Sequence, residues 1–289
     1  MAIRNPVEWG VDQFKHAALA FESAGRAGRR TRDNLHSPAP VVCRIGVTDL
    51  RDVLARGVDD FGAYRTDVIF LCVIYPLVGL VLARLAFGYE MLPLVFPLAS
   101  GFALVGPFAA VGLYEMSRQR ETGIEVTWAD AFGVVRSPSF GAIVLLGLLL
   151  MGIFLLWLVA AEAIYQLTLG PAPPASLASF VRDVFTTDVG WVMIGFGVGV
   201  GFLFALLVLA ISVVSFPLLL DRNVGITQAV ASSFRAVRQN PGAMAAWGLI
   251  IAAGLVIGAI PLLLGLAIVF PVLGHATWHL YRKLLPRPA

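Results

Sequence analysis

Charged side chains are scarce in this chain of 289 residues, and that scarcity bounds its class. Asp, Glu, Lys and Arg make up 13% of the residues, against about 25% in an ordinary soluble domain. Hydrophobic residues make up 58%, and the mean hydropathy is +0.84. So few charges cannot solvate the surface of a soluble domain of this length, which excludes a soluble globular enzyme, a disordered chain and a coiled coil. The composition predicts an all-α protein that crosses the membrane several times.

Cysteine and histidine are also rare, with two and four residues respectively. Neither a Cys-x-x-Cys nor a Cys-x-x-Cys-His pattern occurs, which excludes zinc-ribbon, thioredoxin-like and c-type haem sites. Cys43 lies in a polar stretch and Cys72 in an apolar one, so we expect no disulfide. Because no other catalytic signature is present, we expect a protein that is not an enzyme and has no cofactor.

The charges that are present gather at the start of the chain. Residues 1–67 hold ten of the 21 basic and nine of the 18 acidic residues. We therefore expect a polar N-terminal cytoplasmic segment at 1–45, with an amphipathic helix and a basic linker, then a transmembrane domain at 46–283 and a cytoplasmic tail at 284–289. In such a protein the net charge of +3 reflects topology and not binding to nucleic acid.

About 20 apolar residues in a helix span a hydrocarbon core of roughly 30 Å, and five apolar runs of the chain are about that long or longer. The last of them, 242–274, carries no charge and is too long for one span, so we expect it to break at Gly258 and Pro261 and to form two spans. With both termini in the cytoplasm, the inner segments hold 19 of the 21 Lys and Arg residues, and the outer segments hold only Arg84 and Arg182. That asymmetry satisfies the positive-inside rule. The six expected spans are Val68–Phe87, Met91–Tyr114, Phe140–Ala161, Gly190–Leu220, Ala243–Ile257 and Leu262–Leu280.

Amphipathic segments connect these spans. Apolar residues recur at helical spacing within 50–61, 127–136 and 227–239 on the inner side, and within 177–185 on the outer side. We expect these helices to lie in the membrane interface, where they either seal the edge of the bundle or dock a partner. Each inner segment precedes a pair of spans, and partial sequence matches between the segments suggest three repeated units, each an interfacial helix followed by a helical hairpin.

Two histidines in the last span are the main candidates for chemistry. His275 and His279 are four residues apart and therefore share one face of a helix, a spacing that can hold a metal ion or support haem ligation. The pair lacks a third ligand nearby and the glutamate of a zincin motif. Together with Trp278, the same stretch also fits a membrane-interface anchor or a helix-packing surface.

Few ionisable residues lie at membrane depth, where they are costly and often functional. Glu115 and the pair Asp221 and Arg222 lie at span ends, where we expect ion pairs at the cytoplasmic rim. No chain of Asp and Glu residues crosses the membrane, which argues against a proton pump. Pro107 is one of several prolines and glycines in the second span. It either breaks that helix to line a cavity, as in transporters, or only kinks it.

Several stretches resemble a bacterial family of integral membrane proteins, domain of unknown function 2189. The resemblance covers roughly residues 45–283. It implies a multi-pass protein of the bacterial inner membrane with no agreed activity, and the label that some members carry, predicted cytochrome c oxidase subunit, implies a respiratory partner. The matching stretches are DLRDVLARGVDDF at 49–61, PLASGFALVGPFAAVGLYEMSRQRE at 97–121, FPLLLDR at 216–222, NPGAMAAWGLI at 240–250 and FPVLGHATWHLYR at 270–282.

Three functions are compatible with these features. The leading hypothesis is a non-enzymatic scaffold or accessory subunit of a membrane complex, for which the family label suggests a respiratory oxidase. Its partners would be the lipid bilayer and either that complex or further copies of the chain. The second hypothesis is a small transporter or channel for a neutral or apolar solute. The third is haem or metal binding through His275 and His279.

Overall fold

The computed structural model describes residues 40–287 except 73–91, 125, 171, 173 and 262. The described residues form helices joined by turns, with no strand among them, which confirms the all-α class. The expected N-terminal amphipathic helix, the basic linker and most of the first span lie outside the described residues. In chain order the elements are α2 (Asp49–Cys72), η2 (Leu92–Leu94), α4 (Val95–Ala109), α5 (Val111–Arg120), η3 (Trp128–Arg136), α6 (Phe140–Thr168), α7 (Leu177–Thr186), α8 (Asp188–Ser212), α9 (Ser215–Asp221), α10 (Ile226–Gln239), α11 (Pro241–Ala259) and α12 (Leu266–Leu284).

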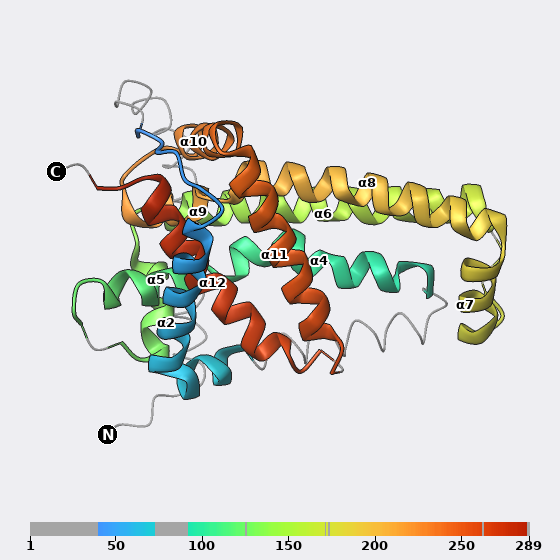
Figure 1. Cartoon of the computed structure of the whole chain (residues 1–289), viewed down its shortest axis with the longest axis horizontal. Coiled ribbons are helices and arrows are strands. Elements are labelled where there is room, and N and C mark those ends of the chain that lie inside the picture. Colours follow the sequence, from blue (N-terminus) through green and yellow to red (C-terminus); the bar gives the residue numbers. More distant parts are fainter. Residues whose placement is uncertain are drawn as a thin grey trace, which may run out of the picture.

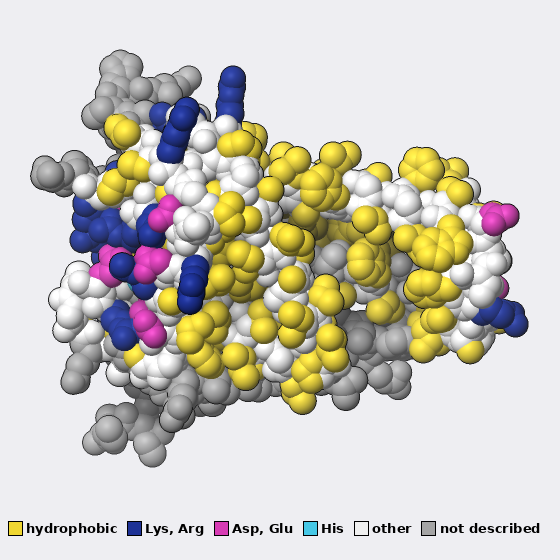
Figure 2. All heavy atoms as spheres, in the orientation of Figure 1, with side chains coloured by type: hydrophobic (Ala, Val, Ile, Leu, Met, Phe, Trp, Pro, Cys, Tyr) yellow, Lys and Arg dark blue, Asp and Glu magenta, His cyan; other side chains and the backbone are white. Residues whose placement is uncertain are grey.

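The molecule is elongated, and most of its charged side chains lie at one end. In Figure 1, α6 and α8 run side by side along the long axis and α7 lies at their far end. Figure 2 shows Lys, Arg, Asp and Glu side chains crowded at the opposite end, while apolar side chains cover the middle of the molecule. We call this the charged end; it comprises residues 49–60, 115–121, 221–239 and 281–287. This separation of charge from apolar surface is the one a bilayer imposes on an embedded bundle.

Four stretches among the described residues are long and apolar enough to span a membrane. They match the second to fifth expected spans, although the third is seven residues longer than expected and the second ends five residues earlier. Many side chains on α6 and α8 are both large and exposed, among them Leu156, Val159 and Phe202, as expected where lipid replaces water around the bundle. The stretches are Leu92–Ala109, Phe140–Thr168, Asp188–Asp221 and Pro241–Ala259.

Two breaks in the helices have causes that can be read from the sequence. Pro217 has no amide hydrogen to give to the carbonyl of residue 213, and the chain turns at 213–214 between α8 and α9. Between α11 and α12, Gly258 and Gly265 pack so closely that a β-carbon on Gly265 would lie 2.8 Å from the Gly258 carbonyl oxygen. The tight break expected at Gly258–Pro261 is therefore confirmed, with α11 ending at Ala259.

The helix α12 differs from the expected sixth span, and it is not among the four candidate spans of the described residues. It begins four residues later than expected and ends at Leu284, with Arg282 and Lys283 in its last turn. Much of its surface is covered by protein, because it packs against α2, α5 and α11. The total of six spans and their arrangement as three repeated hairpins stay predictions.

Part of the apolar stripe expected in residues 50–61 is covered by another helix. Leu50 and Val53 are 2% and 0% exposed, and α2 packs along α12. The face that packs also includes Gly57, where a β-carbon would lie 2.8 Å from the Val272 carbonyl oxygen. Two helices can approach this closely only where one of them lacks a side chain. The surface of α12 therefore covers Leu50 and Val53, whereas Val58 of the same stripe is 52% exposed. The location of this helix in the membrane interface stays a prediction.

Candidate functional site

A buried carboxylate joins three helices at the charged end. Asp60 of α2 is 5% exposed. Its Oδ2 lies 2.6 Å from the Ser117 hydroxyl on α5 and 2.8 Å from Nε2 of His279 on α12, and Arg120 donates to its other oxygen. Ser117 Oγ also lies 2.8 Å from Nδ1 of His275. Because a carboxylate only accepts hydrogen bonds, Ser117 donates to Asp60 and accepts from His275. We call these five residues the Asp60 cluster.

The surroundings of Asp60 favour its charged form. Burial raises the pKa of this carboxyl, but hydrogen bonds from His279 and Ser117 lower it by more and leave the pKa below its ordinary value. The carboxylate is therefore ionised at neutral pH; it pairs with the Arg120 guanidinium of α5 and is hydrogen-bonded to groups of both α5 and α12. The cluster links α2, α5 and α12 by charge-assisted hydrogen bonds.

The lowered pKa of Asp60 predicts that acid weakens this link. Because the folded pKa is below the unfolded value, the unfolded chain binds the proton more readily, so the stability from Asp60 is present above the ordinary pKa and is lost as pH falls through the folded value. Unfolding in detergent at a series of pH values down to about 3 should show this loss, and Asp60→Asn should lose less stability over the same range. Equal acid sensitivity in both proteins would contradict the assignment.

Both histidines of the pair make hydrogen bonds within the Asp60 cluster. His279 binds Asp60, and His275 binds Ser117 and is fully buried. Among the described residues, no group of three or more His, Cys, Asp or Glu side chains is arranged to hold a metal ion. Haem or metal binding by these histidines stays a prediction. Trp278 between them is also fully buried, with its ring 5.3 Å from that of Tyr281, so this side chain contributes to the packing between helices.

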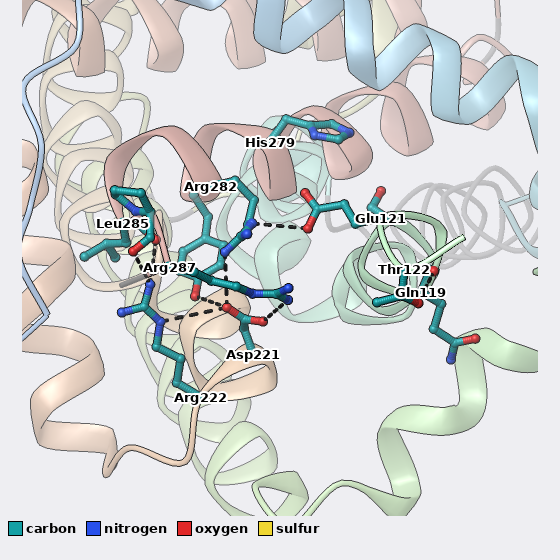
Figure 3. Close-up of polar contacts among 12 residues, drawn as sticks. Gln119, Glu121, Thr122, Asp221, Arg222, His279, Arg282, Leu285 and Arg287 are labelled. Atoms are coloured by element: carbon teal, nitrogen blue, oxygen red, sulfur yellow. Dashed lines mark hydrogen bonds and ion pairs between the residues drawn. The ribbon is translucent and has the colours of Figure 1, made fainter. Parts of the chain in front are cut away.

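A second polar group holds the chain end against the bundle (Figure 3). Asp221 at the end of α9 accepts hydrogen bonds from Tyr281 at 2.7 Å and from Arg287 at 2.9 Å, and it lies 3.5 Å from Arg282. Arg222 donates to the carbonyls of Leu285 at 2.6 Å and Pro286 at 2.8 Å. The ion pairing expected for Asp221 and Arg222 is present, and both residues restrain the segment that follows α12.

Glu115 lies in the first turns of α5 and is 3% exposed. It accepts hydrogen bonds from Arg118 at 2.6 and 2.8 Å and from Gln119 at 2.8 Å, all within its own helix. Such pairs at spacings of three and four residues stabilise a helix. These contacts of Glu115 therefore support α5, whereas those of Asp60 and Asp221 connect helices distant in the sequence.

An apolar cavity of about 610 Å³ lies beside these polar groups, among α4, α8, α11 and α12. Pro107 and its neighbour Gly106 form part of its wall. Ser212 and Thr277 also line it, but their hydroxyls donate to backbone carbonyls of their own helices at 2.6 and 2.7 Å. The rest of the wall is almost entirely Ala, Gly, Val, Leu, Ile, Met and aromatic side chains. The cavity therefore offers hydrophobic contact and few polar groups.

The sequence locates some of these residues and misses others. The sequence allows two interpretations of Pro107, a residue that lines a cavity or one that only kinks its helix. In the structure Pro107 lines the cavity. Asp60 and Ser117 are not singled out by any sequence motif. The available signal for Asp60 is its spacing, since residues 50, 53, 57 and 60 share one helical face, and three of them are apolar or glycine.

Comparison with known proteins agrees with this architecture over part of the chain. A family model described as predicted integral membrane protein (DUF2189) matches residues 95–221, which run from the start of α4 to the end of α9. No curated protein and no solved structure matches the chain. The resemblance expected from the sequence is confirmed for this stretch. Over residues 95–221 the chain is therefore similar to the DUF2189 family of predicted integral membrane proteins.

Proposed function

We propose that this protein binds an apolar molecule within the bilayer, in the cavity among α4, α8, α11 and α12. The observation that carries the proposal is the cavity itself. Its volume of about 610 Å³ falls within the range of roughly 300–1,000 Å³ that is usual for ligand sites. Of the hypotheses raised by the sequence, this develops the second, a transporter or channel for a neutral or apolar solute, and it narrows the solute to an apolar one.

The wall of the cavity argues against a polar solute. The hydroxyls of Ser212 and Thr277 are already bonded to backbone carbonyls, and most other lining side chains are apolar. A polar group moved from water into such surroundings without a hydrogen bond costs roughly 2–7 kcal/mol. An apolar molecule has no such cost, and it can reach the cavity from the hydrocarbon of the bilayer.

The broken second span gives the cavity its shape. Pro107 cannot donate a backbone hydrogen bond, and α4 ends two residues later at Ala109. A β-carbon at Gly106 would lie 3.5 Å from the ring of Phe270 on α12, so the absent side chain leaves room between the two helices. This is the cavity-lining alternative for the prolines and glycines of this span.

A photoactivatable long-chain hydrocarbon in lipid nanodiscs should test the binding. Met244 lines the cavity and is 1% exposed, whereas Val256 on the same helix is 64% exposed. We expect the probe to label both residues in the unchanged protein. Gly248→Phe should lower labelling of Met244 at least tenfold and leave Val256 unchanged, because Gly248 lines the cavity and its added side chain would occupy that space.

The matched control is Gly242→Phe, since this glycine is exposed on the same helix, is not part of the cavity wall, and has open space where a β-carbon would be added, with no heavy atom within 4 Å. It should leave labelling of both residues as it was. An unlabelled Met244 in the unchanged protein, or equal labelling of Met244 in both variants, would overturn the proposal.

The other hypotheses stay predictions. A scaffold or accessory subunit, a respiratory complex or further copies of the chain as partners, and the absence of enzymatic activity all remain to be tested. Purification in mild detergent from cells with a full respiratory chain, followed by mass spectrometry, tests the partner. Recovery of the chain only by itself would count against a respiratory complex.

A further inference from the structure

We infer that the occupant of the cavity is one acyl chain of an anionic phospholipid, drawn from the leaflet at the charged end. This inference rests on the proposed function and names its ligand class. Three observations carry it: the length of the cavity along the helices, its position relative to the charged end, and the arginines on the helix at that position.

The length of the cavity suits an acyl chain. On α11 its lining residues run from Pro241 to Leu255, and on α8 from Phe202 to Ser212, the last residue of that helix. At 1.5 Å per residue, these runs are about 21 and about 15 Å long. One leaflet contributes about half of a hydrocarbon core that is roughly 30 Å thick. The run on α8, which lies along the long axis of the molecule in Figure 1, therefore matches the depth of one leaflet.

The cavity begins at the charged end. Val237 of α10 and Pro241, the first residue of α11, both line it. In Figure 1, α10 lies at the upper edge of the charged end, and α11 starts beside it. A chain that enters the cavity from the surrounding leaflet would thus leave its headgroup at the level of α10.

The charge of α10 selects the headgroup. Residues 226–239 contain Arg235 and Arg238 and no Asp or Glu. Phe234 of the same helix is 46% exposed, which is the pattern of an interfacial helix with basic residues beside apolar ones. Each basic residue near an anionic membrane surface contributes about 1 kcal/mol of attraction. An anionic headgroup, whose phosphate has no positive group beside it, therefore fits this position better than a zwitterionic or uncharged headgroup.

Lipid retention tests the inference. The full chain is placed in nanodiscs that contain equal amounts of phosphatidylglycerol and phosphatidylcholine with identical acyl chains. It is then extracted into detergent, and the lipids retained are counted by native mass spectrometry. We expect phosphatidylglycerol to be retained at least fivefold over phosphatidylcholine. Arg235→Gln with Arg238→Gln should bring that ratio close to one, since about 1 kcal/mol for each arginine corresponds to about fivefold.

The matched control is Arg51→Gln with Arg136→Gln, which removes two exposed arginines from elements that contribute no residue to the cavity wall. This pair should keep the preference of the unchanged protein. Gly248→Phe should remove retained lipid of both kinds, and Ala245→Phe, at another lining position, provides a second variant for the same purpose. Thermal unfolding of each variant shows whether it is folded, and only folded variants are compared.

The possible outcomes distinguish a failure of the anionic-lipid inference from a failure of the proposed apolar binding site. Equal retention of the two lipids, together with loss of both in Gly248→Phe, would overturn the anionic lipid and leave the apolar site standing. Retention that neither cavity variant changes would overturn the proposed function as well. Displacement of phosphatidylglycerol by excess inorganic phosphate would assign the arginines to a free anion and would also overturn the inference.

Discussion

Asp60→Ala is expected to lower the free energy of unfolding by about 3–5 kcal/mol, the cost of removing one partner of a buried ion pair. Asp60 is 5% exposed and accepts hydrogen bonds from Ser117, Arg120 and His279. Without the carboxylate, these three donors have lost a shared acceptor inside the protein. Denaturant unfolding in detergent at neutral pH measures the effect.

The neighbouring residue provides the control for this prediction. Asp59 is exposed on the same helix, and Asp59→Ala should change the unfolding free energy by no more than about 0.5 kcal/mol. A double-mutant cycle between Asp60 and His279 should show a coupling energy of about 1 kcal/mol or more, as for other residues in direct contact. If the Asp60 variant costs no more than the Asp59 variant, the cluster does not hold the three helices together.

The spans could be predicted from the sequence because hydrophobicity is a local property. The long uncharged run within 242–274 and the runs at 140–161 and 190–220 identify α6, α8 and α11 without knowledge of any contact. Asp221 and Arg222 were also predictable as a rim pair, since charges that directly follow a long apolar run must lie near its end.

The packing of α2 and α12 could not be predicted in the same way. Their contact joins residues more than 200 positions apart, such as Asp60 and His279. A carboxylate on an amphipathic helix is usually solvated, and its burial here depends on donors from two other helices. The cavity could not be predicted from the sequence either, because the same apolar residue types face a cavity and face lipid. Only the several prolines and glycines of the second span, Gly106 and Pro107 among them, distinguish it from the other spans.

Gly57→Ala is expected to lower the free energy of unfolding by about 1–3 kcal/mol, the usual range for overpacking. The added β-carbon would lie 2.7 Å from the Ala276 β-carbon and 2.8 Å from both the Ala276 nitrogen and the Val272 carbonyl oxygen. Two of these three atoms belong to the backbone of α12, so no side-chain rotation relieves the contact. The helices must move apart, and Asp60, one turn further along α2, would be drawn away from His279.

The next glycine of α2 provides a control in which the expected sign is reversed. Gly62 is exposed, and a β-carbon there would meet no atom within 4 Å. Gly62→Ala should therefore raise the unfolding free energy by up to about 1 kcal/mol, since alanine favours a helix over glycine. Gly57→Ala gains the same helix propensity, so a lower unfolding free energy in that variant must come from contact with α12. Stabilisation by both substitutions would show that α2 and α12 are not packed at this distance, and it would remove the geometric basis of the Asp60 cluster.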